Sequence, residues 1–244
     1  MPDSPVYEEF DRGRFSEKVS SLERSGARIG VVGAAPRACY RAFARQVSSP
    51  TKGAPEIYAL AGDEAECESW MDCRASLMSP SRKAIRYDRT HRVSVAEDVP
   101  VNVREDGSSE RFESVDSADA FLDSSRTALE NLIDESYNSP KMMMFSLPIL
   151  ADEIGWDPVC EFIIDGGYRL KEHNGVGIFC VDRGLKNKTV EEIKHLFDAL
   201  VVLRQQDTVG EAAVYQKWFI SEQKESKRQN IASPWLPVSG GEML

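Results

Sequence analysis

Short apolar runs alternate with helix-like segments through the second half of the chain, and this alternation limits the fold more than any other feature. Lys141–Leu147, Gly175–Val181 and Phe197–Leu203 are apolar runs typical of buried strands. The segments between them carry apolar residues at helical spacing, so that successive strands lie about 30 residues apart. Strands joined through helices pair in parallel, and the helices cover the faces of the sheet. The pattern predicts an α/β fold with a mainly parallel sheet.

The first half supplies a further strand, turn and helix in close succession. Ala27–Gly33 is an apolar run that ends in glycine, and a helix-like segment from Phe15 to Ser25 precedes it. Pro36 suits the first turn of a following helix, because proline has no N–H to leave unpaired. We expect a second strand at Glu56–Leu60 and an antiparallel strand at Val214–Ile220.

Capping residues predict where the later helices begin. Ser117 is the expected N-cap of a long helix, and another helix is expected to begin near Trp156 or Pro158. Thr189, with Glu192 three residues on, has the spacing of a capping box. Residues 63–78 are expected to be helical in part, residues 83–104 extended, and residues 105–111 a polar loop.

The length of 244 residues suits one large domain with tails. We predict a flexible N-terminal arm at 1–13, a single domain at 14–220 and a C-terminal tail at 221–244. No apolar run is long enough to span a bilayer, and the first residues lack the apolar core of a secretory signal. These features predict a cytoplasmic protein.

The chain carries a formal charge of −10, which disfavours binding to phosphate backbones unless basic residues cluster. One such cluster exists, with Tyr87 inside it, and it is the best candidate for contact with nucleic acid. Its basic residues are Arg82, Lys83, Arg86, Arg89 and Arg92.

Cysteine and histidine positions give no metal or disulfide pattern. The five cysteines form no C-x-x-C pair, and the three histidines are scattered, so we expect no bound metal and no cofactor. Cys39 follows the predicted start of a helix, where a lowered thiol pKa would permit redox sensing.

The strand, glycine, turn and helix around Gly33 invite comparison with the phosphate-binding loop G-x-x-x-x-G-K-[ST]. In that register the second glycine is Ala38, the lysine is Cys39 and the hydroxyl residue is Tyr40. The sequence therefore lacks the second glycine that lets backbone N–H groups surround the phosphates, the lysine that neutralises them and the hydroxyl that binds magnesium. The remaining candidate for a weak anion or nucleotide site consists of Gly33, Arg37 and Arg41.

The second half also resembles a known family. Gly175–Asp182 and the segment Thr189–Arg204 look like the C-terminal core of RecA/KaiC-type ATPase domains, and are closest to small KaiC-like proteins of haloarchaea. Met143–Leu147 lies where that family's strand ends in Asp-Ser-Leu, with Phe145 in place of the aspartate. The resemblance covers roughly 117–220 and implies a three-layer RecA-like fold with helices on both faces of the sheet. The acidic composition agrees with a halophile.

These observations favour a protein that is not an enzyme. The hypothesis is a KaiC/RecA-like regulatory or scaffold protein that acts through a protein partner or a homo-oligomer. One alternative is a DNA-binding, transcription-linked regulator that uses the basic cluster at 82–92. Another is a weak nucleotide- or anion-binding sensor, and a third is a diverged enzyme that uses Asp182 at the end of its strand.

Overall fold

A ten-stranded sheet organises the computed structural model, in the order β10-β8-β7-β1-β6-β5-β2-β3-β4, with β9 paired to β8. The structure describes residues 11–47, 56–62, 82–88, 112–135, 139–208, 211–224 and 227–238. The strands are β1 (Ala27–Val32), β2 (Glu56–Gly62), β3 (Arg82–Asp88), β4 (Phe112–Val115), β5 (Lys141–Phe145), β6 (Val176–Val181), β7 (Ala199–Thr208), β8 (Glu211–Lys224), β9 (Lys227–Ala232) and β10 (Leu236–Pro237).

The sheet is parallel from β7 to β4 and antiparallel where β8, β9 and β10 join it. β1 lies between β6 and β7, so the first strand of the chain pairs with strands that arrive about 150 residues later. β6 and β7 therefore share the centre of the sheet with β1. The predicted antiparallel strand at Val214–Ile220 is confirmed as part of β8.

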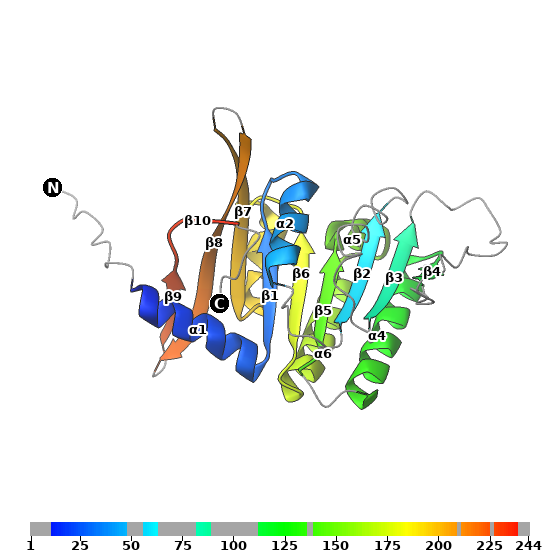
Figure 1. The fold of residues 1–244 in the computed structure, drawn as a ribbon. Helices are drawn as coiled ribbons and strands as arrows, with labels where there is room; N and C mark the ends of the chain where they lie inside the picture. The colour runs from blue at the N-terminus through cyan, green and yellow to red at the C-terminus, as the bar shows by residue number, and fades with distance from the viewer. Residues whose placement is uncertain are drawn as a thin grey trace, which may run out of the picture.

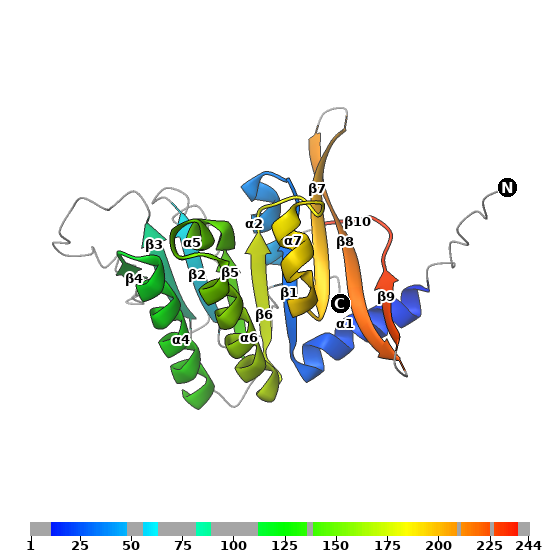
Figure 2. The same cartoon turned by 180° about the vertical axis from the view of Figure 1, so that it is seen from behind.

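Helices cover both faces of the sheet (Figures 1 and 2). α1 (Arg12–Ser25) and α2 (Arg37–Val47) lie on one face. The other face carries α4 (Ala118–Glu135), α5 (Leu147–Ile154), α6 (Trp156–Glu172), α7 (Lys188–Ile193) and the 3-10 turn η2 (Lys194–Leu196). The predicted three-layer α/β fold, a mainly parallel sheet with helices on both faces, is confirmed.

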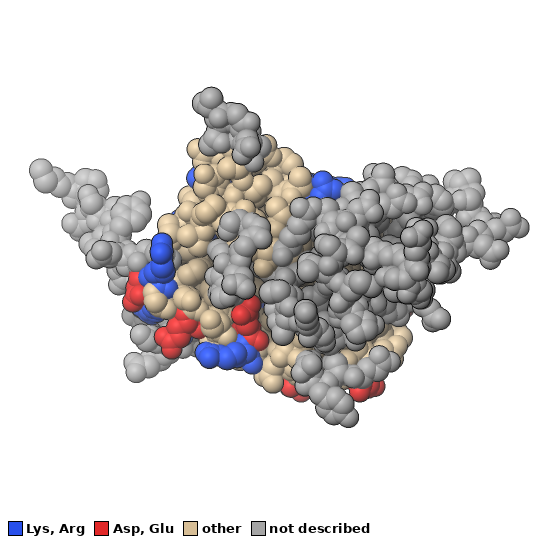
Figure 3. Space-filling model, in the orientation of Figure 1, with Lys and Arg blue, Asp and Glu red and all other residues tan. Residues whose placement is uncertain are grey.

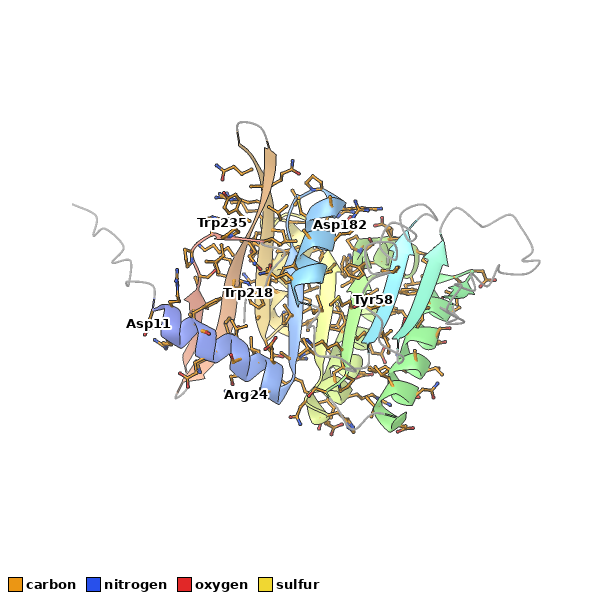
Figure 4. All side chains as sticks on the ribbon, in the orientation of Figure 1. Asp11, Arg24, Tyr58, Asp182, Trp218 and Trp235 are labelled. Atoms are coloured by element: carbon orange, nitrogen blue, oxygen red, sulfur yellow. The ribbon has the colours of Figure 1, made fainter. Side chains whose placement is uncertain are left out.

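Trp218 of β8 anchors the core under α1 and α2 (Figure 4). Its ring packs against Phe15 and Phe43, at centroid distances of 6.4 and 6.1 Å. Its indole N–H donates to the buried side chain of Gln216 at 3.0 Å, and Gln216 donates to Gln46 of α2 at 2.9 Å. Polar side chains buried in this way are stabilising only when they are hydrogen-bonded, and this chain of bonds fixes α2 on β8.

The described residues of the segment predicted as a C-terminal tail add to the same sheet. Ser233 donates its backbone N–H to the carbonyl of Trp218, and its hydroxyl accepts the N–H of Trp218, both at 2.9 Å. Trp235 then stacks against Arg204, whose guanidinium lies 4.0 Å from the ring centroid. Trp235 therefore folds back onto the domain.

Several predicted element boundaries are corrected. The strand predicted to reach Leu147 ends at Phe145, because Ser146 adopts φ 61° and ψ 46° and α5 begins immediately after it. The sequence analysis did not predict α5. The N-cap of α7 is Asn187, whose side chain accepts the N–H of Thr189 at 3.0 Å, so the capping box predicted at Thr189 is wrong.

Other predictions hold or lie outside the structure. Ser117 is confirmed as a helix cap, since its hydroxyl accepts the N–H of Ala120 at 3.2 Å. The predictions for residues 63–78 and for 89–111 lie outside the described residues. Within the described parts of the chain, no helix has the length and apolar character needed to cross a membrane.

A clamp of opposite charges fixes the amino end of β1. The Asp198 carboxylate accepts the Arg28 N–H at 2.8 Å and the Lys171 ammonium at 3.0 Å, and the Asp198 N–H donates to the Arg28 carbonyl at 2.9 Å. Gly167 leaves room for the Arg28 side chain, because a β-carbon there would lie 2.3 Å from Arg28 Cδ. The clamp joins β1, α6 and the residue before β7.

Asp198→Ala is expected to lower the free energy of unfolding by about 2 kcal/mol, because it leaves a part-buried backbone N–H and two cations without their acceptor. The measurement is urea unfolding at neutral pH. The matched control is Asp123→Ala, whose side chain is 75% exposed and pairs only with Arg126 on the same helix. That control should change stability by less than about 0.5 kcal/mol, and equal losses for the two variants would contradict the clamp.

Candidate functional site

The carboxyl ends of β1 and β6 form the natural place for a site in this fold. The chain leaves β1 toward α2 on one face and leaves β6 toward α7 on the other (Figures 1 and 2). In open α/β sheets, ligands bind in the crevice where connections diverge in this way. We call this place the β1–β6 crevice. By this name we mean Gly33–Pro36 after β1, Asp182 and Arg183 after β6, and the first turns of α2.

Tyr40 of α2 closes the β1–β6 crevice. Its side chain is buried, and its hydroxyl lies 2.6 Å from the Gly33 carbonyl and 3.2 Å from the Val181 carbonyl. A phenol has one proton to donate, so the two carbonyls share it, with the shorter bond to Gly33. The aromatic side chain thus bridges the end of β1 and the end of β6.

Gly33 makes its contacts with protein groups rather than leaving them for a ligand. Its N–H donates to the Arg183 carbonyl at 2.8 Å, and its carbonyl accepts from Tyr40. Its φ is +149°, and a β-carbon on it would lie 2.2 Å from the Leu203 carbonyl oxygen of β7. Glycine is needed at position 33 because the backbone of this residue lies too close to the backbone of Leu203 to admit a side chain.

Asp182 follows β6 and supplies a carboxylate to the crevice. Its buried Oδ1 atom has no hydrogen-bond partner among the residues that the structure describes. Burial raises the pKa of the Tyr40 hydroxyl far above its ordinary value, and Cys180, Asp182 and Cys39 raise it further. Burial and the Asp182 carboxylate also raise the pKa of the Cys180 thiol. Each of these groups is held in its neutral form beside a carboxylate.

Ser146 follows β5 in a conformation that non-glycine residues rarely adopt. With φ at 61°, it is one of two such residues in the described part of the chain, the other being Asn174. Its side chain makes no capping bond to α5. Phe145, which occupies the position of the missing aspartate, is buried in the core beneath α1 and α2. The end of β5 therefore offers no carboxylate to a metal ion.

The predicted cationic residues of the crevice lie along α2. Arg37 is the first residue of α2 and is exposed, while Arg41 lies one turn later and is half-buried. The structure thus brings Gly33, Arg37 and Arg41 to the same end of the sheet, and their role in binding an anion stays a prediction.

The basic cluster predicted to contact nucleic acid is only partly described. Arg82, Lys83 and Arg86 lie in β3, which pairs with β2 and β4, and Arg89 and Arg92 lie outside the described residues. On the face that carries α1 and α2, charged side chains of both signs mix along α1 (Figure 3). Nucleic-acid binding through residues 82–92 stays a prediction.

The expectation that Cys39 has a lowered pKa is wrong. Its side chain is buried, and burial raises the pKa of the thiol. The closing role of Tyr40 was missed, because the motif comparison registered only the loss of a small hydroxyl residue. The signal available was the apolar face of α2, where Tyr40 lies three residues before Phe43 and four before Ala44.

Comparisons with known proteins are consistent with a domain of unassigned activity. A family model described as "Family of unknown function (DUF7504)" matches residues 26–203. No curated protein matches the chain in sequence. A similar solved structure is that of the KaiC-like protein PH0186 from the hyperthermophilic archaeon Pyrococcus horikoshii OT3, with a TM-score of 0.49 and 13% identity, over 87% of this chain and 85% of that chain. The family match includes the ends of β1 and β6, and so the whole crevice.

Tyr40→Phe tests the closure of the crevice. The variant is expected to be less stable at neutral pH by about 1 to 2 kcal/mol, because two carbonyls lose their donor. The folded wild-type protein keeps the phenolic proton at pH values where the unfolded chain loses it, so wild-type stability falls as pH rises above about 10. The variant lacks this loss, and the two stabilities should converge.

Urea unfolding of both proteins from neutral pH to alkaline pH provides the measurement. The other tyrosines and the lysines are common to both proteins, so the difference between the two curves isolates Tyr40. A constant difference above pH 10 would contradict the buried, neutral phenol.

Proposed function

The chain belongs to this family of unknown function (DUF7504), and from the geometry of the β1–β6 crevice we propose that it is a non-catalytic RecA-like regulatory or scaffold protein. It acts through protein partners or self-association rather than by turning over a nucleotide. The observation that carries the proposal is Tyr40, whose buried side chain bridges the ends of β1 and β6, where ligands bind in open α/β sheets.

The backbone around Gly33 supports this proposal. A phosphate-binding loop works by pointing several backbone N–H groups at the anion. Here the Gly33 N–H already donates to Arg183, and the Gly33 carbonyl is tied to Tyr40. Admitting a triphosphate would break these bonds and expel a buried aromatic ring, and each lost buried bond costs about 1 to 3 kcal/mol.

The charges near the crevice support it as well. Asp182 places a carboxylate beside the position where a phosphate would lie, and no lysine follows in the register of the motif, where Cys39 stands instead. Phosphoryl transfer depends on positioning and on neutralising the charge of the phosphates. In the described ranges, no three His, Cys, Asp or Glu side chains come together in a way that would hold a metal ion.

The same observations weigh against the anion sensor built on Gly33, Arg37 and Arg41, since the N–H and the carbonyl of Gly33 are already bonded to Arg183 and Tyr40. The DNA-binding alternative is tested by a gel shift at several salt concentrations. If it were right, binding would be lost in Arg82→Ala and Arg86→Ala and would weaken steeply with salt.

Calorimetric titration with ATP and Mg²⁺, together with a phosphate-release assay, tests the proposed function. The wild-type protein is expected to bind ATP with a dissociation constant above about 1 mM and to release no phosphate. A triple variant combines Ala38→Gly, Cys39→Lys and Tyr40→Thr. It restores the second glycine, the cation and the small hydroxyl of the motif, and should tighten ATP binding at least about tenfold.

The matched control for that variant carries Ala38→Gly and Tyr40→Thr without Cys39→Lys. It opens the crevice but supplies no cation, so it should bind ATP no better than the wild-type protein. Steady hydrolysis or micromolar ATP binding by the wild-type protein would reject the proposed function.

A further inference from the structure

A cavity of about 300 Å³ is lined by residues of α4 and α6. These two helices lie on the side of the sheet opposite α1 and α2 (Figure 2). The floor of the cavity is formed by Leu129 of α4 and by Phe162 and Gly166 of α6. It lies away from the β1–β6 crevice and plays no part in the closure of that crevice by Tyr40.

Gly166 lines the cavity and is itself buried. A β-carbon on Gly166 would lie 3.6 Å from Leu129 Cδ2 and 3.7 Å from the Phe162 ring, which is ordinary contact. These contacts do not require glycine here, in contrast to the next residue, Gly167, which must admit Arg28. Glycine inside a helix costs about 1 kcal/mol relative to alanine, so an unforced glycine over a cavity points to close approach by another surface.

Two apolar side chains stand beside this cavity. Tyr168 is 63% exposed and Ile164 is 43% exposed, and they are the large hydrophobic residues of the described chain that remain exposed. They lie one helical turn apart on α6, on either side of Gly166. The surface thus carries a protruding aromatic side chain and a receiving hole next to each other.

The charges around the cavity are of both signs. Arg126 and Arg169 line it together with Asp165. The first arginine pairs with Asp123 at 3.1 Å and the second with Glu130 at 2.6 Å. Two copies of a chain with charge −10 repel each other overall, so a contact between them requires a locally balanced surface of this kind.

We propose that this surface is a two-fold interface between two copies of the chain, in which Tyr168 of each copy enters the cavity over Gly166 of the other. A two-fold interface brings the same patch together twice, so the patch must carry both the protruding and the receiving feature. The arrangement also brings Asp165 of one copy toward the cationic rim of the other. The inference rests on the proposed function, and it specifies the self-association that this function includes.

Sedimentation velocity of the full chain over a range of concentrations tests the interface. The wild-type protein is expected to form a dimer. Tyr168→Ala removes the protruding ring and should raise the dimer dissociation constant about 30-fold, which corresponds to about 2 kcal/mol for a central interface aromatic. Gly166→Leu fills the hole and should weaken the dimer to a similar degree.

Controls separate the interface from effects on folding. Glu161→Ala changes an exposed residue of α6 outside the cavity and should leave the dissociation constant unchanged. Gly166→Ala fits in ordinary contact and has a better helix propensity, so it keeps the fold and should weaken the dimer less than Gly166→Leu. Thermal unfolding of each variant shows that it is folded.

Salt provides a second readout. Because the two copies repel through their net charge while the contact itself is largely apolar, raising the salt from about 0.1 to about 1 M should tighten the dimer. A wild-type protein that stays monomeric, a dimer that tolerates both Tyr168→Ala and Gly166→Leu, or open-ended polymers would each overturn the interface.

The two proposals fail in different assays. ATP binding by the wild-type protein would reject the proposed function, and the sedimentation data would still decide whether the interface exists. A monomeric protein that does not bind ATP would reject only the interface.

Discussion

The enclosure of β1 between β6 and β7 is the constraint on which the rest of the structure depends. Because its neighbours arrive late in the chain, the first core strand folds only when both ends of the domain come together. Each end of β1 is tied to those late residues by polar contacts. At the amino end, Arg28 is held by Asp198, and at the carboxyl end, Gly33 is held by Arg183 and Tyr40.

The same contacts decide what the carboxyl end can do. A ligand can bind where the connections from two neighbouring strands go to opposite faces of the sheet. It can do so only if the backbone N–H and carbonyl groups there have no other partner. Here the N–H and the carbonyl of Gly33 are both taken up, and the glycine approaches Leu203 closely. The hydrogen bonds that fix the end of β1 therefore also take up the backbone groups that a ligand at this end would need.

Much of the fold was predictable because its signals are local. Buried parallel strands are continuous apolar runs, and β1, β5 and β6 appear in the sequence as such runs. The strand was predicted to extend to Leu147, because the apolar Leu147 follows the run after a single small residue, Ser146. In the structure, Ser146 adopts a left-handed backbone conformation, and the strand ends before it. Sequence periodicity carries no information on that turn.

The site was predictable only in what it lacks. Motif spacing identified three missing chemical groups at Ala38, Cys39 and Tyr40, and this required no structure. What replaces those groups depends on contacts between residues as far apart as Tyr40 and Val181, which no local pattern encodes. β9 and β10 escaped prediction for the same reason, since both strands are short and are defined by their pairing with β8.

The stability of the fold comes from two cores on either side of the sheet, which are built from apolar side chains of β1, β5 and β6 and of the helices that cover them. Two adjacent glycines of α6 play different parts in this packing. A β-carbon on Gly167 would collide with Arg28, whereas a β-carbon on Gly166, which lines the cavity between α4 and α6, would meet Leu129 and Phe162 in ordinary contact. The packing of Arg28 therefore requires glycine at 167, and the contacts around Gly166 do not.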